Sequence, residues 1–190
     1  MTSAAENQLS GDAVEAFERD GYVICRGVID ESLINEVNDH VGWLQARHPD
    51  VRPEQLGHAF LRDDPFWVVP GSHRGPVAEM RDNETVESVL GKEIAVEVDE
   101  SQAVDMVLAP GDVEVHHPNI VHGSNANTSP NRRCGLTIRY IPTSTRITDP
   151  EVPYPSAFHL QGSPGVNSYQ PRPRYVEGRD FPFAGCSEWT

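Results

Sequence analysis

The chain has 190 residues, of which 37% are hydrophobic, and its 29 acidic and 15 basic residues give a net charge of −14. This length allows one domain with a hydrophobic core. The negative charge argues against nucleic acid or an anionic membrane as a partner, and no apolar run is long enough to span a bilayer. We therefore expect an acidic cytoplasmic protein without a signal peptide.

Turn-forming residues are frequent, with 16 prolines and 15 glycines. This content favours a turn-rich, mainly β domain over a helix bundle. The three cysteines are odd in number and widely spaced, so they do not predict a disulfide framework. Cys25 and Cys134 lie in apolar strand patterns, and we expect both in the core.

The first part of the chain predicts two helices with a strand between them. Residues 1–11 are small and polar and are expected to be disordered. A short helix over residues 12–19, with Asp12 as its N-cap, stops at Gly21. The apolar run over residues 22–28 predicts a strand, and Asp30 then caps a longer helix with an apolar stripe.

The middle of the chain gives shorter signals. Residues 53–61 predict a short helix. Val68 and Val69 predict a strand fragment that ends in a Pro-Gly turn. Residues 76–92 are polar with a weak helical pattern, and we expect them to lie on the surface.

From Glu93 the hydrophobic pattern changes to a period of two, which is typical of strands. Four short strands are expected, at residues 93–98, 104–108, 113–116 and 136–140. In the third of them, alternation places Glu114 and His116 on the face opposite to Val113 and Val115. Closely spaced strands with Gly, Pro and Asn turns predict a jelly-roll, cupin-like sheet.

A candidate site lies where the third strand gives way to the fourth. His122 stands at a strand end, followed by Gly123 and Ser124, and a strand end is a rigid position for a metal ligand. Arg133 opens the next predicted strand. Its guanidinium could clamp a carboxylate with two parallel hydrogen bonds. Residues of these types could hold a metal ion and a carboxylate, although a lone histidine at a strand end is more often structural.

Three motifs occur in order along the chain. They are Phe-x-x-Asp-Gly-Tyr-Val over residues 17–23, Val-Pro-Gly-Ser-His-Arg over residues 69–74, and Pro-Gly-Asp through His-Gly-Ser to Arg over residues 110–133. Together they resemble the phytanoyl-CoA dioxygenase family of iron(II)/2-oxoglutarate-dependent oxygenases. The resemblance implies a mainly β fold with N-terminal helices and a partial double-stranded β-helix. It also implies hydroxylation of a small organic substrate.

The resemblance assigns roles to individual residues. His122 would be an iron(II) ligand, and Arg133 would bind the distal carboxylate of the cosubstrate 2-oxoglutarate. Ser124 would donate a hydrogen bond to the same carboxylate. Structural or supporting roles beside the site are expected for three further residues, His117, Ser72 and His73.

One part of the family pattern is missing. The family holds iron with two histidines and one carboxylate, and the first histidine and the carboxylate form a His-x-Asp motif before the Pro-Gly-Ser-His segment. Here Trp67 runs straight into Val68, as if several strands had been deleted at this junction. The literal and nearest candidates for the missing ligands are His48 with Asp50, and Asp63 with Asp64.

Three functions therefore remain open. The first is a working oxygenase that completes its iron site from these candidates or from a second chain. The second is a non-catalytic, internally deleted family member, and the third is a cupin-like protein that holds a different metal through His116 or His117 with His122. Because deleted strands expose sheet edges, a homodimer through an open edge is also expected.

We expect three segments in the chain. Residues 1–11 form a disordered N-terminus, residues 12–150 form the truncated, oxygenase-like jelly-roll domain with its N-terminal helices, and residues 151–190 form an extended C-terminal tail.

Overall fold

The computed structural model describes residues 10–50, 66–82, 92–94, 97–124, 135–148 and 156–186. The chain divides into two units, residues 1–136 and residues 137–190. Within the described part of the first unit, two α-helices accompany three small antiparallel sheets. No helix among the described residues is long and apolar enough to cross a membrane.

Helix α1 (Gly11–Asp20) begins one residue earlier than its apolar pattern predicts. Its N-cap is Ser10, whose side chain accepts a hydrogen bond from the backbone N–H of Ala13. The prediction of Asp12 as the cap is wrong. Asp12 lies in the first turn, where its negative charge stabilises the helix by interacting with the helix dipole. The predicted disorder is also wrong for residues 10 and 11. Gly21 ends the helix in the left-handed conformation, with φ at 84°.

Helix α2 (Glu31–Arg47) confirms the prediction made from its apolar stripe and its cap. The Asp30 carboxylate accepts a hydrogen bond from the backbone N–H of Leu33 at 2.9 Å. This bond and a second one from the hydroxyl of Ser32 hold the pKa of Asp30 below its usual value. The helix ends at Arg47, and its C-cap residue, His48, lies directly before Pro49.

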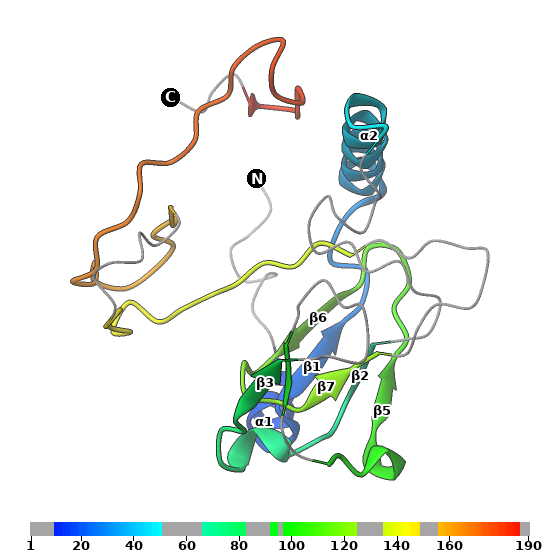
Figure 1. The fold of residues 1–190 in the computed structure, drawn as a ribbon, viewed down its shortest axis with the longest axis vertical. Coiled ribbons are helices and arrows are strands. Elements are labelled where there is room, and N and C mark those ends of the chain that lie inside the picture. Colours follow the sequence, from blue (N-terminus) through cyan, green and yellow to red (C-terminus); the bar gives the residue numbers. More distant parts are fainter. Residues whose placement is uncertain are drawn as a thin grey trace. The chain divides into compact units, whose positions relative to one another are not determined.

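Two of the three sheets join strands that are distant in sequence, and the third joins two consecutive strands (Figure 1). One sheet pairs β1 (Tyr22–Cys25) with β6 (Val113–His116). A second places β2 (Phe66–Val68) between β5 (Val104–Met106) and β7 (His122–Gly123). A third pairs β3 (Met80–Asp82) with β4 (Lys92–Ile94). Antiparallel neighbours that are not consecutive in the chain are typical of jelly rolls. The predicted fold class, a partial jelly roll with N-terminal helices, is confirmed.

Two predicted elements differ from the structure. Residues 76–92 gave a weak helical pattern, but β3 within them is a strand that pairs with β4. Residues 136–140 gave a strand pattern, but they form no strand, and Leu136, Ile138 and Tyr140 are 73%, 63% and 72% exposed. Alternation describes a strand only when a partner strand accepts its hydrogen bonds. The helix predicted over residues 53–61 lies outside the described residues.

Among the described residues of the first unit, a small core centres on β2. Its buried residues are Val68, Met106 and Ile120, and Tyr22, Ile24 and Phe66 pack against them. The core therefore joins β2 and β5 to the turn that precedes β7. Cys25, predicted in the core, is half-buried, and Cys134 lies outside the described residues.

Asp112 ties the turn before β6 to the loop after β1. Its carboxylate accepts hydrogen bonds from Arg26 Nη1 at 2.6 Å and from the backbone N–H groups of Gly27 and Ala109, each at 2.9 Å. The Asp112 side chain is only 6% exposed. These donors, with that of Arg26 first, lower the pKa of Asp112 to about 2. The ionised form is therefore strongly preferred in the folded chain.

This pKa predicts how an Asp112→Asn variant responds to acid. Because the folded pKa lies below the unfolded value of 3.8, the stability from this carboxylate is fully present above pH 4 or so and is lost as pH falls toward 2. We expect the variant to unfold at a clearly lower temperature than the parent at pH 6, and the difference to shrink at acid pH. Thermal unfolding across this range measures it.

The control for this experiment is Asp105→Asn, which removes an exposed carboxylate from β5. It should change the unfolding temperature little at any pH. A gap between the Asp112 variant and the parent that stayed constant from pH 6 to pH 2 would contradict the ionised-anchor interpretation.

Candidate functional site

His122 opens β7, where it pairs with Val68 of β2. Its Nδ1 donates a hydrogen bond to the backbone carbonyl of Ile120 at 2.8 Å. A carbonyl can only accept, so the proton lies on Nδ1 and the lone pair of the neutral ring lies on Nε2. The side chain is accessible to solvent. His122 is therefore held by its backbone surroundings in the tautomer that offers Nε2 to a metal ion.

Ser72 fixes the strand that carries His122. The residue lies in the short 3-10 helix η2 (Ser72–Arg74) after β2. Its hydroxyl donates to the Val69 carbonyl at 2.7 Å and accepts from the Val121 N–H at 2.8 Å. The backbone N–H of Val69 in turn donates to the Val121 carbonyl at 2.9 Å. The Pro-Gly-Ser-His segment is thus bonded directly to the residue that precedes His122.

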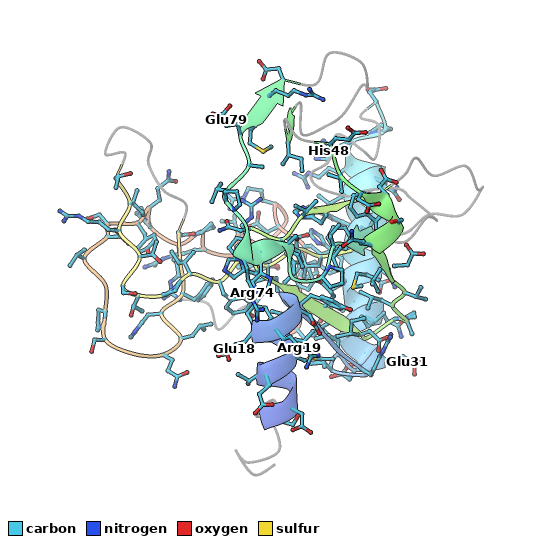
Figure 2. The ribbon with its side chains drawn as sticks, turned by 90° about the horizontal axis from the view of Figure 1, so that it is seen from below. Glu18, Arg19, Glu31, His48, Arg74 and Glu79 are labelled. Atoms are coloured by element: carbon cyan, nitrogen blue, oxygen red, sulfur yellow. The ribbon has the colours of Figure 1, made fainter. Side chains whose placement is uncertain are left out.

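The next residues of that segment bind the end of α1. Arg74 Nη2 donates to the Glu18 carbonyl at 2.8 Å, and His73 Nε2 lies 3.3 Å from the same oxygen. Figure 2 shows Arg74 beside Glu18 at the end of this helix. His73 also stacks against His117, with ring centroids 5.2 Å apart. Its Nδ1 is buried and has no hydrogen-bond partner among the described residues. These contacts give the signature a role in joining α1 to the site strands.

A second histidine lies against His122. His116, at the end of β6, has its ring centroid 5.3 Å from that of His122. Its Nδ1 bonds the Glu114 carboxylate, at 2.8 Å from Oε2 and 3.1 Å from Oε1. Phe66 contacts both rings, at 5.6 Å from His116 and 5.2 Å from His122. Both imidazoles therefore pack against the same apolar side chain, that of Phe66.

The other expected site residues are not gathered here in the same way. Ser124 is half-buried and follows β7 directly. His117 packs against His73 and accepts a hydrogen bond at Nδ1 from the N–H of Asn119. His48 and Asp50, the literal His-x-Asp match, are both exposed after α2. The assignments of Arg133, Asp63 and Asp64 lie outside the described residues.

Two residues that contact His116 or His122 were not singled out from the sequence. Glu114 shares a strand face with His116 by alternation, so the period of two could have identified it as a partner. Phe66 gave no signal, because its contact with both histidines depends on the pairing of β2 with β7.

Comparison with known proteins finds a family that part of the chain resembles. Residues 56–135 match the phytanoyl-CoA dioxygenase (PhyH) family. An ectoine dioxygenase of Sphingopyxis alaskensis is 32% identical over 116 residues, which are 54% of this chain and 38% of that relative. The match thus spans less than half of the relative's length. The predicted resemblance to this family is confirmed over a region that contains the Pro-Gly-Ser-His segment and His122.

Similar solved structures are less close in sequence. The structure of EvdO2 from Micromonospora carbonacea var. aurantiaca, in complex with 2-oxoglutarate, is 15% identical, with a TM-score of 0.49 over 64% of this chain and 86% of that one. The non-heme α-ketoglutarate-dependent carbocyclase SnoK from nogalamycin biosynthesis is 16% identical, with a TM-score of 0.42 over 67% and 81%. Neither likeness assigns a residue or a substrate to this chain.

The residues of this chain fit the iron site of the family pattern, two histidines and one carboxylate, only in part. His122 fits one ligand position, because its Nδ1 is bonded and its Nε2 lone pair is left for a metal. Within the described ranges, no three His, Cys, Asp or Glu side chains are grouped to hold one ion. The carboxylate ligand of the family pattern is thus not found in the part of the chain that the structure describes.

Proposed function

We propose that this chain is an iron(II)/2-oxoglutarate-dependent oxygenase of the phytanoyl-CoA dioxygenase type, with His122 as a ligand of the iron. The observation that carries the proposal is the hydrogen bond from His122 Nδ1 to the Ile120 carbonyl, within the family-matched region. It presents Nε2 in the tautomer that iron binds. The name of the related ectoine dioxygenase supports a small organic substrate.

The residues of the chain have separate tasks in this proposal. Bound iron(II) and 2-oxoglutarate would supply the oxidising chemistry together with molecular oxygen: one oxygen atom would enter succinate as the cosubstrate loses CO₂, and the other would hydroxylate a substrate C–H bond. Arg133 and Ser124 would grip the distal carboxylate of 2-oxoglutarate, as the resemblance implies. Phe66, which contacts the His122 ring, would keep water from one side of it. Ser72 would hold the strand of His122 in place.

A non-catalytic role is the second candidate, and one observation favours it. No three metal-ligating side chains come together among the described residues, and the sequence has no His-x-Asp motif between residues 51 and 69. A chain in which the iron triad stays incomplete would bind an organic acid or a partner protein without turnover.

The remaining parts of the proposal concern surroundings and partners. We propose a cytoplasmic location and a small molecule as the substrate. The net charge of −14 argues against nucleic acid or an anionic membrane as a partner. A homodimer through an open sheet edge remains a prediction of the deleted strands.

An anaerobic titration of the full chain with iron(II) and 2-oxoglutarate tests the oxygenase proposal. We expect a visible metal-to-ligand charge-transfer band in the parent. His122→Ala should abolish the band because it removes a ligand, and Arg133→Ala should weaken cosubstrate binding about tenfold or more because a charge-assisted pair is lost. Succinate production from 2-oxoglutarate in air gives the second readout.

Arg139→Ala is the matched control, since Arg139 is an exposed arginine of the second unit. It should leave both the band and its cosubstrate dependence unchanged. A folded parent protein with a flat spectrum at saturating iron(II) and 2-oxoglutarate would refute the oxygenase proposal and favour the non-catalytic one.

A further inference from the structure

The rings of His116 and His122 lie close together. The proposed role of His122 as a single iron ligand does not explain this contact. The two residues come from different sheets, since β6 pairs with β1 and β7 pairs with β2. Their ring centroids are nevertheless 5.3 Å apart, with an angle of 41° between the ring planes. Two imidazoles on one tetrahedral metal ion, with metal–nitrogen bonds of about 2.0–2.1 Å, have ring centroids about 5 Å apart. The observed spacing thus suits a shared ion.

Both rings have the same nitrogen occupied. His116 Nδ1 donates to the Glu114 carboxylate at 2.8 Å, and His122 Nδ1 donates to the Ile120 carbonyl at 2.8 Å. Each neutral ring therefore carries its proton on Nδ1 and its lone pair on Nε2. A histidine that binds a metal through one nitrogen commonly donates from the other to a carboxylate or a backbone carbonyl. Here His116 donates to a carboxylate, and His122 donates to a backbone carbonyl.

The nearby pair of His73 and His117 shows that ring contact alone does not produce this arrangement. Its centroids are equally close, at 5.2 Å. However, His117 Nδ1 accepts from the N–H of Asn119, and His73 Nε2 is directed at the Glu18 carbonyl. That pair therefore does not have both Nδ1 atoms acting as donors, as the pair of His116 and His122 does.

The enclosure of Glu114 adds to the argument. Its side chain is 10% exposed, and that of His116 is 30% exposed. Val115, between them, is 39% exposed, so the polar face of β6 is turned inward and an apolar side chain is left outward. Enclosing a carboxylate costs free energy unless it is paired. A carboxylate held against an imidazole is the arrangement that makes a histidine a better metal ligand.

We propose that Nε2 of His116 and Nε2 of His122 bind one divalent transition-metal ion, with Glu114 as the positioning residue of His116. Imidazole ligands suit zinc, copper, nickel and iron. The inference rests on the proposed function for the role of His122 and deepens it. His116 takes the place of the histidine that the missing His-x-Asp motif would have supplied.

Copper(II) alone is the probe for this site, because electron paramagnetic resonance of copper counts the nitrogen ligands. We expect one copper ion per chain with two imidazole nitrogens. His116→Asn and His122→Asn should each lower the copper affinity at least tenfold and remove one nitrogen from the spectrum. Glu114→Gln should lower the affinity about 10–100-fold without removing a nitrogen. A His116→Asn variant that binds copper like the parent would overturn the proposal.

His48→Asn is the matched control, since His48 is the histidine of the literal His-Pro-Asp sequence and is exposed after α2. It should leave copper binding unchanged. A measurement on the parent protein avoids variants that fail to fold. Zinc should protect His116 and His122, but not His48, from acylation by diethyl pyrocarbonate, as read by peptide mass spectrometry. Equal modification of all three with and without zinc would also overturn the proposal.

The two proposals fail in different ways. If copper requires His122 but not His116, the second ligand is elsewhere and only this inference fails. If copper requires both histidines but iron(II) and 2-oxoglutarate give no charge-transfer band, the metal site stands and the oxygenase proposal fails.

Discussion

Replacing Gly111 by alanine should lower the free energy of unfolding by about 3 kcal/mol or more. Gly111 has φ at 91°, in the left-handed region, where a side chain costs roughly 1–2 kcal/mol. A Cβ atom at this position would lie 2.6 Å from the backbone carbonyl oxygen of Ile29. The N–H of Ile29 also donates to the Gly111 carbonyl at 3.0 Å. The contact is therefore between two backbones, neither of which can move aside cheaply.

Urea unfolding of the Gly111→Ala variant measures this loss. The control is Gly27→Ala, which also has positive φ, at 61°, but nothing within 4 Å of the added Cβ atom. It should lower the free energy of unfolding only by the cost of placing a Cβ atom on left-handed backbone, roughly 1–2 kcal/mol. The difference between the two variants isolates the clash with Ile29. Equal losses would mean that the turn before β6 yields without cost, contrary to the close packing described here.

The functional consequence follows from the position of this turn. Gly111 and Asp112 hold the start of β6 against the loop after β1, and β6 carries Glu114 and His116. A shift in the turn is transmitted along four residues of strand to the imidazole. We therefore expect the Gly111→Ala variant to bind copper more weakly than the Gly27→Ala variant at the same fraction folded.

Replacing Gly21 by alanine should lower the free energy of unfolding by about 2–4 kcal/mol. Gly21 is buried and ends α1 with φ at 84°, and its added Cβ atom would overlap the ring of His73, at Nδ1. The same glycine accepts a hydrogen bond from the N–H of His117 at 2.8 Å. The residue thus lies where α1, the Pro-Gly-Ser-His segment and the end of β6 meet, and no room remains for a methyl group.

A double-mutant cycle with His73→Ala separates the two causes. Removing the ring should restore the part of the stability that the overlap costs and leave the cost of positive φ. Gly71→Ala, with φ at 77° and open space around the Cβ position, gives the conformational cost alone. If Gly21→Ala costs no more than Gly71→Ala, then His73 can turn away freely and does not fix the end of α1.

Local signals in the sequence were sufficient to predict several of the helices and strands of this protein. The spacing of apolar residues and the cap at Asp30 predicted α2, because helix formation depends on neighbours within a turn. The Pro-Gly-Ser-His and His-Gly-Ser motifs predicted the match of residues 56–135 to the phytanoyl-CoA dioxygenase family, and the alternation after residue 93 predicted β5 and β6. At α1 the local signal was misleading, since Ser10 and Asp12 are both good caps and only one begins the helix.

The tertiary structure decided which strand patterns became strands and which faces turned inward. Residues 136–140 alternate as well as β6 does, yet within the described ranges only β6 has a partner strand, which is β1. Alternation separated Glu114 and His116 from Val113 and Val115, but it could not tell which face is enclosed. The meeting of His116, His122 and Phe66 depends on the pairing of strands far apart in sequence, because hydrogen bonds between strands, and not the order of residues, bring these side chains together.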